Sequence, residues 1–253
     1  MVLELRNPHS VLAALQTRPH DVVEIRLHSD RASGAWKDVV HLAAQRRIPV
    51  TRGVSRRGGG RRSRKSDPET TERTGAAEAT VKEHSGVSIE TLFNNCADRA
   101  AGRGLWLALD CLQDPHNVGA VIRSAAFFGV QGVVVTRDRS APLNSTVHDI
   151  AAGGLEHVPV AIQGNLSRAL DHAKDAGLWI LGSSEHAKQD IGEIPRDRPW
   201  LLVLGNEEQG LRRLTLDKCD DVCKLSPRGA VTSLNVSVAA GILIATLSGS
   251  TPT

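Results

Sequence analysis

The stretch WLLVLG, residues 200–205, is apolar at five successive positions, with no alternation between apolar and polar residues. A strand with one face in water alternates, whereas a strand covered by helices on both faces is apolar throughout. Five more short apolar runs, several of them also uninterrupted, are separated by segments with helical spacing. They are 105–109, 132–136, 158–162, 178–182 and 221–225. This order predicts an α/β fold whose parallel sheet lies between two layers of helices.

Bulk composition excludes several classes of protein. The 253 residues suit one large domain or a small domain plus a medium one, and 40% hydrophobic with 23% charged residues is ordinary for a soluble protein. No apolar run reaches the length of a membrane span, and the start lacks the pattern of a secretory signal. The four cysteines do not form two close pairs, which predicts reduced thiols and no metal site. We therefore expect a cytoplasmic protein without a membrane partner.

The chain before residue 89 divides into two parts. Residues 1–52 have the pattern of a small α/β domain, in which Asn7-Pro8 starts the first helix. Residues 53–88 form a linker that is first basic and then acidic, with a possible remnant strand. Net charge is only +3, yet residues 51–66 hold seven Arg and Lys and no acid. Such a segment is expected to be flexible, and it either contacts nucleic-acid phosphate or is simply solvated.

Ligands of open parallel sheets bind at the carboxyl ends of the strands, so the loops after Leu109, Leu204 and Leu225 hold the candidate site. The first is DCLQDPHNVGAVIRSAAFFG, residues 110–129. Asn117 can cap the helix that follows, and the apolar residues of that helix fall on one side. Arg123 points to the opposite side, and by itself this stretch also fits an ordinary exposed helix arginine.

The second stretch is LGNEEQGLRRL, residues 204–214. Gly205 and Gly210 are spaced as in a phosphate-binding loop, but the Lys-Ser/Thr that should follow is absent, which excludes a nucleotide P-loop. A carboxylate here, such as Glu207, suits a ligand with hydroxyls, an amine or a positive charge. The same residues also fit a plain acidic turn.

The third stretch is SLNVSVAAGILI, residues 233–244. Ser233 or Asn235 can cap the helix, but capping explains only one of the three polar residues at its start. The sequence therefore predicts that the polar start of this helix lies in a site, while its apolar remainder is buried.

Taken together, the three stretches resemble the three signature motifs of the TrmH-type branch of the SPOUT RNA methyltransferases. The first motif is matched by Asn117 to Ala120 with Arg123, the second by Leu204 to Glu207 with Gly210, and the third by Ser233 to Ser237. Residues 138–160 and 211–221 are similar to the bacterial ribosomal RNA guanosine 2′-O-methyltransferases of the RlmB kind.

The resemblance implies a SPOUT domain at 89–253 with a C-terminal trefoil knot, bound S-adenosylmethionine, and a homodimer with the site at the subunit boundary. Residues 1–52 would be an RNA-binding domain. Arg123 is then the catalytic arginine, which binds RNA phosphate or accepts the hydroxyl proton. Asn117 would orient Arg123 or the ribose, Glu207 would hold the arginine or the loop, and Ser233 and Asn235 would contact RNA or cofactor. Main-chain groups would cradle the cofactor at Leu204, Gly205, Gly210, Leu225 and Leu234.

The expected substrate is a guanosine ribose of 23S ribosomal RNA, because tRNA enzymes of this family usually lack an N-terminal domain. Two alternatives remain open: a tRNA 2′-O-methyltransferase, and a non-catalytic RNA-binding protein of ribosome assembly. The chain has no Tyr, three Phe and four Trp. Since few aromatics are present to stack on bases, arginine contacts to phosphate should dominate, and RNA binding should depend strongly on salt.

Overall fold

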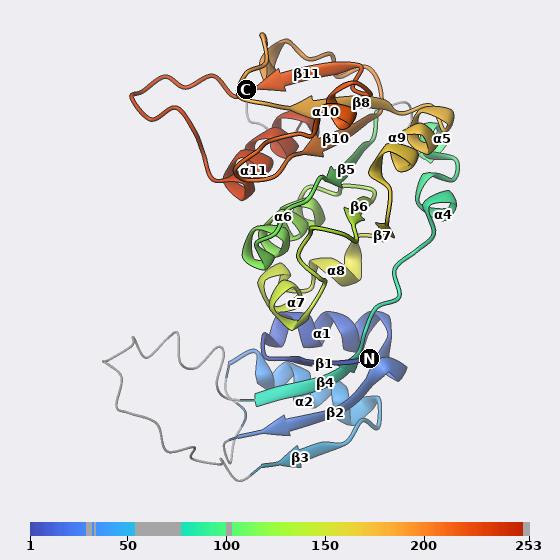
Figure 1. The fold of residues 1–253 in the computed structure, drawn as a ribbon. Coiled ribbons are helices and arrows are strands. Elements are labelled where there is room, and N and C mark those ends of the chain that lie inside the picture. Colours follow the sequence, from blue (N-terminus) through green and yellow to red (C-terminus); the bar gives the residue numbers. More distant parts are fainter. Residues whose placement is uncertain (29–31, 33, 54–76, 100–102, 250–253) are drawn as a thin grey trace.

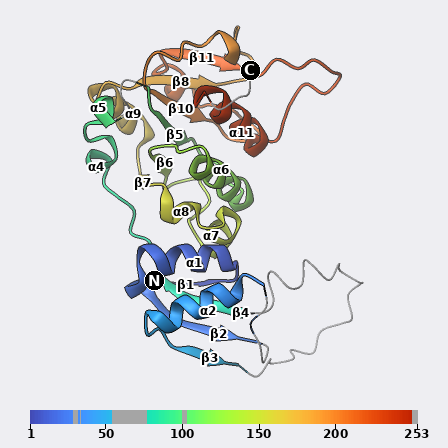
Figure 2. The same ribbon diagram turned by 180° about the vertical axis from the view of Figure 1, so that it is seen from behind.

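The computed structural model describes residues 1–28, 32, 34–53, 77–99 and 103–249. The chain forms a small N-terminal unit and a larger α/β unit, and both views place helix α1 of the first beneath helices α7 and α8 of the second (Figures 1 and 2). Most of the expected basic and acidic linker lies outside the described residues. In the described part of the chain, no helix combines the length and apolar character that crossing a membrane requires.

The N-terminal unit is a four-stranded sheet with strand order β1-β4-β2-β3, on which two helices pack. Strand β4 pairs antiparallel with both β1 and β2, so it is an inner strand of this sheet. The N-terminal unit therefore continues past the predicted boundary at residue 52, into the segment where the sequence predicted a linker with a possible remnant strand. The elements are β1 (Val2–Leu5), α1 (Pro8–Thr17), β2 (Val22–Leu27), α2 (Trp36–Gln45), β3 (Val50–Arg52) and β4 (Ala77–Lys82).

A physical cause explains why the sequence marked this strand only as possible. In β4 the buried positions are Ala77, Ala79 and Val81, two of which are too small to give a strong alternating apolar signal. By contrast, the expected start of α1 is confirmed, because the Asn7 side chain accepts a hydrogen bond from the backbone N–H of His9 at 2.9 Å.

The larger unit contains a seven-stranded sheet in the order β7-β6-β5-β10-β8-β11-β9, and all its strand pairs are parallel. The six apolar runs of the sequence all form strands, with ends shifted by at most two residues. The two-residue strand β9 was not expected. The strands are β5 (Leu105–Leu109), β6 (Val133–Thr136), β7 (Val160–Gln163), β8 (Trp179–Ser183), β9 (Gln189–Asp190), β10 (Trp200–Leu204) and β11 (Asp221–Lys224).

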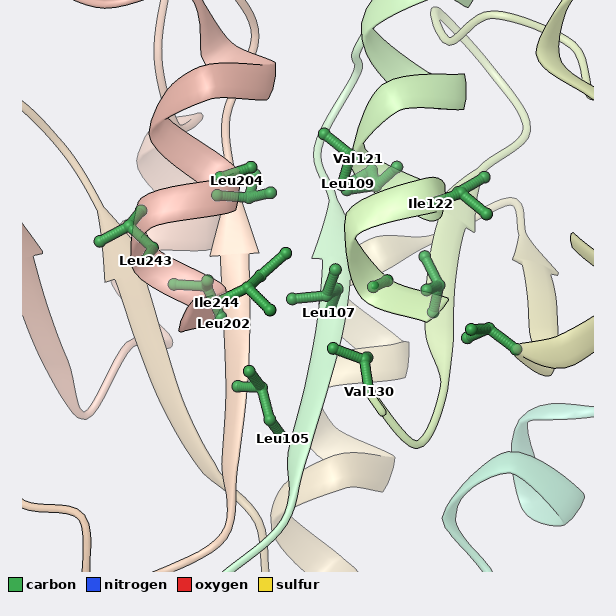
Figure 3. Close-up of a cluster of buried hydrophobic side chains, with 14 of the residues drawn as sticks. Leu105, Leu107, Leu109, Val121, Ile122, Val130, Leu202, Leu204, Leu243 and Ile244 are labelled. Atoms are coloured by element: carbon green, nitrogen blue, oxygen red, sulfur yellow. The ribbon is translucent and has the colours of Figure 1, made fainter. Parts of the chain in front are cut away.

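Helices cover both faces of this sheet, which confirms the predicted α/β architecture with a parallel sheet between helices. On one face, Leu107 and Leu202 from adjacent strands pack under helices α6 and α11, with Ile122 and Ile244 among the contacting side chains (Figure 3). That layer contains α6 (Pro115–Phe127), α7 (Ser145–Ala151), α8 (Gly154–His157) and α11 (Val236–Leu247). The other face packs against α4 (Ile89–Phe93), α5 (Cys96–Arg99) and α9 (Leu166–Asp175), and the short α10 (Arg213–Leu216) precedes β11.

The two units are joined by a buried ion pair. Arg18, just after α1, donates from Nε and Nη2 to the two carboxylate oxygens of Glu156 on α8, at 2.8 and 2.7 Å. The Arg18 and Glu156 side chains are only 13% and 2% exposed. Burial raises the pKa of Glu156, but the hydrogen bond and charge of Arg18 outweigh it and hold that pKa below its ordinary value. The pair therefore remains ionised.

Further hydrogen bonds surround this ion pair. The backbone N–H groups of Arg6 and Asn7 donate to the Asp149 carboxylate at 3.0 and 2.9 Å, and the Ser10 hydroxyl donates to the carbonyl of His148. Burial lowers the pKa of the His148 imidazole to about 4, so this side chain is neutral at the interface. We call the contact of residues 6–18 with residues 148–156 the domain junction.

Candidate active site

The three stretches singled out in the sequence meet at one edge of the larger sheet. Strands β5 and β10 are neighbours, with Leu109 opposite Leu204, so the loops that follow them lie side by side. The first loop leads into α6 and the second is the turn 205–210. Helix α11 packs on α6 and brings the third stretch to the same place.

A chain of hydrogen bonds joins the three motifs. Asn235 Nδ2 donates to Asn117 Oδ1 at 3.1 Å, and Asn117 Nδ2 donates to Glu207 Oε1 at 3.2 Å. Asn206 Nδ2 donates to the other Glu207 oxygen at 3.3 Å and to the carbonyl of Cys111 at 2.9 Å. Residues bonded directly to each other in this chain are separated by up to 118 positions in the sequence. The amides fix the Glu207 carboxylate and leave it able to accept a further hydrogen bond from a ligand hydroxyl.

Asn117 does not cap helix α6, contrary to the expectation from the sequence. The cap is Asp114, whose carboxylate accepts from the N–H of His116 at 2.9 Å, and Pro115 occupies the first helical position. Proline suits the first helical position, because its fixed φ is helical and an N–H at that position would have no partner within the helix. The helix therefore begins earlier than the sequence predicted. The Asn117 side chain is consequently free to bridge Asn235 and Glu207, and the residue is only 8% exposed.

The turn 205–210 is a tight hairpin in which Asn206 and Gly210 exchange two backbone hydrogen bonds of 3.0 Å. A Cβ added at Gly205 would lie 2.3 Å from the carbonyl carbon of Gly210, and Gly210 has φ +66°. Both positions therefore need glycine. The N–H groups of Glu208 and Gln209 donate to the Asn206 side chain, so they are not available as a phosphate cradle. The hairpin therefore works as a support for Glu207.

Asn235 caps α11, accepting from the N–H of Ser237 at 2.9 Å, which confirms one of the two caps expected from the sequence. Ser233 and Leu234 are exposed in the preceding loop, which extends away from the body of the domain (Figure 1). Within the described residues, the structure gives Ser233 no side-chain contact with Asn117 or Glu207. The structure thus joins Asn235, but not Ser233, to the hydrogen bonds of Asn117, and the contact of Ser233 with RNA or cofactor stays a prediction.

Arg123 lies on the exposed side of α6, as its helical position predicts. Among the residues that the structure describes, it has no hydrogen bond or ion pair to Asn117 or Glu207. Within the described part of one chain, neither side chain therefore holds Arg123. The other roles expected from the resemblance, that Asn117 orients the ribose and Glu207 holds the loop, stay predictions. Arg123 is followed four residues later by Phe127, which is 82% exposed on the same side of the helix.

A pocket of roughly 490 Å³ opens beside the hydrogen-bonded chain, within the size range of small-ligand sites. Eight of its eleven lining residues were not singled out as site residues from the sequence, and Cys111, Asp114, Arg139 and Arg212 are among them. The complete lining is Cys111, Gln113, Asp114, Asn117, Arg139, Asn206, Glu207, Glu208, Gln209, Gly210 and Arg212. Cys111 and Arg139 both have left-handed backbone conformations, with φ of 61° and 58°. Such strained positions concentrate at functional sites, but they have no signature in a single sequence.

The positions expected to hold a cofactor lie at the same edge of the sheet. Leu204 is buried at the end of β10, Gly205 follows it, and Leu225 packs partly buried against the core just after β11. Leu234 is 52% exposed immediately before α11. Among the described residues, no group of three or more His, Cys, Asp or Glu side chains could hold a metal ion.

Residues 104–245 match the family of proteins described as the SpoU rRNA Methylase family, and this region is more than half of the 253-residue chain. The chain belongs to the SpoU rRNA methylase family. One relative, the 23S rRNA (guanosine-2'-O-)-methyltransferase RlmB of Pseudomonas aeruginosa, is 37% identical over 238 residues, which cover 93% of this chain and 92% of the relative.

Two solved structures share the fold of this SpoU family member. The SpoU methyltransferase AviRb from Streptomyces viridochromogenes, in complex with AdoMet, has a TM-score of 0.74 at 19% identity, covering 98% of this chain and 89% of its own. The AdoMet-bound rRNA methyltransferase from Sinorhizobium meliloti has a TM-score of 0.74 at 16% identity, with coverages of 100% and 88%. The SpoU match contains the whole hydrogen-bonded chain and Arg123, whereas β1 to β4 lie before it.

Proposed function

We propose that this protein transfers a methyl group from S-adenosylmethionine to the 2′-hydroxyl of a guanosine ribose in 23S ribosomal RNA. Membership of the SpoU family and the name of the Pseudomonas relative support the reaction and the substrate. The observation that carries the proposal is the hydrogen-bonded chain Asn235–Asn117–Glu207, which unites three distant motifs beside one pocket. An RNA substrate of this kind also supports action in the cytoplasm.

The edge of the sheet fits the cofactor in its chemistry. The ends of β10 and β11 and the start of α11 offer main-chain donors and acceptors at Gly205, Leu225 and Leu234, together with apolar side chains. These are the groups that an adenine ring and its ribose require. When bound there, S-adenosylmethionine supplies a methyl group activated on a sulfonium. We propose that the C-terminal segment forms the trefoil knot of SPOUT proteins around this place.

The chain's own residues then position the hydroxyl and handle its proton. Glu207, held by two amides, can accept a hydrogen bond from a ribose hydroxyl, and Asn117 orients Glu207. Holding the hydroxyl in line with the methyl group accounts for a large part of such a rate enhancement. Arg123 engages the RNA strand, either at a phosphate or at the reacting hydroxyl. Accepting a proton is the chemically difficult role, because an arginine guanidinium keeps its own proton in proteins.

We propose that the active form is a homodimer. Helices α6 and α11 pack together and carry exposed apolar side chains, since Phe127, Val238 and Ile242 are 82%, 50% and 42% exposed. Exposed apolar surface of this kind is typical of an interface. Because Arg123 lies beside Phe127 on α6, burying this surface in a dimer would bring Arg123 to the subunit boundary.

The test is methyl transfer in vitro from tritiated S-adenosylmethionine to purified 23S rRNA, with purified tRNA as the comparison. We expect label in 23S rRNA and resistance of the modified linkage to alkali, as a 2′-O-methyl group confers. Label in tRNA alone would show that tRNA, and not 23S rRNA, is the substrate. Absence of cofactor binding in calorimetry would favour a non-catalytic protein. Mapping ribose methylation in the rRNA of a deletion strain would locate the nucleotide.

A further inference from the structure

Two arginines line the pocket beside Asn117 and Glu207 but have no part in the catalysis proposed above. Arg139 comes from the loop after β6, and Arg212 comes from the segment between the 205–210 turn and α10. They lie 73 positions apart in the sequence, and only the fold brings them to the same pocket.

Arg212 is held in place by a buried carboxylate. Its Nη2 lies 2.7 Å from Asp110 Oδ1, and Asp110 is 0% exposed at the end of β5. The second Asp110 oxygen accepts from the Thr215 hydroxyl at 2.7 Å. Burial lowers the pKa of Arg212, but the hydrogen bond and charge of Asp110 more than offset this, and the guanidinium is cationic.

The Arg212 side chain is 43% exposed despite this anchor. Among the described residues, Asp110 is its only ion-pair partner. A guanidinium has five N–H donors in a rigid fork, so one edge can rest on Asp110 while another is presented to the pocket. Such an arrangement pre-organises a binding group and lowers the entropy lost when it binds an anion.

Arg139 is also carried on a fixed backbone. The N–H of Ala141 donates to the carbonyl of Leu112 at 2.8 Å, and the Ser140 and Thr136 hydroxyls share a hydrogen bond. Arg139 itself has a left-handed backbone conformation, with φ +58°, between these contacts. Its side chain is exposed and has no ion pair with a described residue.

The pocket lining therefore combines two chemically different kinds of group. Glu207 is held by amides and can accept hydroxyls, and the Asp114 carboxylate is used in capping α6. Glu208 adds a third, exposed carboxylate. Arg139 and Arg212 supply guanidinium donors, which match phosphate geometry. An RNA strand alternates a hydroxyl-bearing sugar with a phosphate, and phosphate contacts set its register on a protein.

We infer that Arg139 and Arg212 bind a backbone phosphate of the RNA next to the ribose engaged at Asn117 and Glu207. This assignment rests on the proposed function, since it names how the same site holds its substrate. The carboxylate of the cofactor is the other anion that two guanidiniums could take, and the experiment separates the two.

The first variant is Arg139→Gln, because Arg139 is exposed and has no buried partner. For Arg212 the double variant Asp110→Asn with Arg212→Gln avoids leaving an unpaired buried carboxylate. The matched controls are Arg137→Gln and Arg213→Gln, which remove exposed arginines from the same two segments but outside the pocket lining. Binding of 23S rRNA transcripts is measured from about 50 to about 300 mM KCl, and cofactor binding is measured by calorimetry.

We expect Arg139→Gln to weaken RNA binding about tenfold, as loss of one charge-assisted hydrogen bond implies. The slope of log affinity against log salt should become shallower by about 0.7, the value for one phosphate contact on a single strand. Affinity for S-adenosylmethionine should stay within about twofold of wild type, because a phosphate-binding arginine does not contact the cofactor.

An unchanged slope for Arg139→Gln and for the double variant would overturn the assignment. Weakened cofactor binding with normal RNA binding would assign the anion to the cofactor carboxylate, and equal slope losses in the two controls would indicate general charge attraction. Either result contradicts the assignment. A wild-type protein that transfers no methyl group to RNA would instead remove the proposed function, and that result does not depend on any of these variants.

Discussion

The domain junction gives the sharpest prediction about stability. Glu156→Gln removes the carboxylate that accepts the two shortest side-chain hydrogen bonds of Arg18, at 2.8 and 2.7 Å. The Arg18 guanidinium itself keeps its place. Thr17 Oγ1, 3.2 Å from the same carboxylate, is also affected. Removing one member of a buried pair typically destabilises by about 3–5 kcal/mol, since the other charge is left without compensation.

The expected value here is lower than that range. Arg18 retains 13% exposure, donates from Nη1 to the carbonyl of Lys82 at 2.6 Å, and lies 3.5 Å from Asp21. These partners compensate part of the charge, so we expect a loss of about 2–3 kcal/mol at the junction. We expect the two units to separate before either of them unfolds, because Glu156 stabilises the contact between them.

Hydrogen exchange read by mass spectrometry is the suitable assay, because a two-unit chain need not unfold in one step. Protection should fall in peptides covering 6–18 and 148–157, with little change in peptides covering β5 and β10. The double variant Arg18→Met with Glu156→Leu should recover much of the protection, since apolar pairs often replace buried ion pairs without loss. The control is Asp197→Asn, which breaks the exposed Asp197–Arg198 pair and should change nothing measurable. Wild-type protection at the junction in Glu156→Gln would refute this reasoning.

Three further predictions concern the site and pH. Arg123→Ala should leave a folded dimer by size-exclusion chromatography but nearly abolish methyl transfer, and near-normal turnover would remove Arg123 from the mechanism. Gly205→Ala should distort the hairpin, since its Cβ would lie 2.3 Å from a backbone carbon of Gly210, and we expect at least a tenfold loss of turnover with a normal far-ultraviolet spectrum. The His148 pKa is about 4 in the folded protein against 6.5 for an ordinary histidine, so only the unfolded chain gains this proton as pH falls from 6.5 to 4. Stability should decline over that window, and urea midpoints of His148→Gln should decline less steeply; an identical slope in both proteins would contradict the assignment.

The sheet and its two helical layers could be predicted because burial leaves a local record. A strand such as Leu105–Leu109, buried at every position, has no polar residue to place in water, so helices must cover both of its faces. The same reasoning located the loops after β5 and β10, where the hydrogen-bonded chain of Asn235, Asn117 and Glu207 was then found. The likeness to known methyltransferase motifs, rather than spacing, supplied their chemical roles.

Other features could not be predicted because their cause lies in contacts between distant residues. The inner strand β4 follows a long basic and acidic segment, and its partners β1 and β2 precede it by many residues. The Asp110–Arg212 and Arg18–Glu156 pairs join residues 102 and 138 positions apart, and each charged residue looks locally like an ordinary surface residue.

By itself, the sequence determined which segments are buried, because burial acts on each residue where it stands. Only the tertiary structure decided which charges meet, that Asn117 serves the site instead of capping its helix, and that two arginines share a pocket with Glu207. Electrostatic and hydrogen-bond partners are selected by proximity in space, and a linear pattern does not encode that distance.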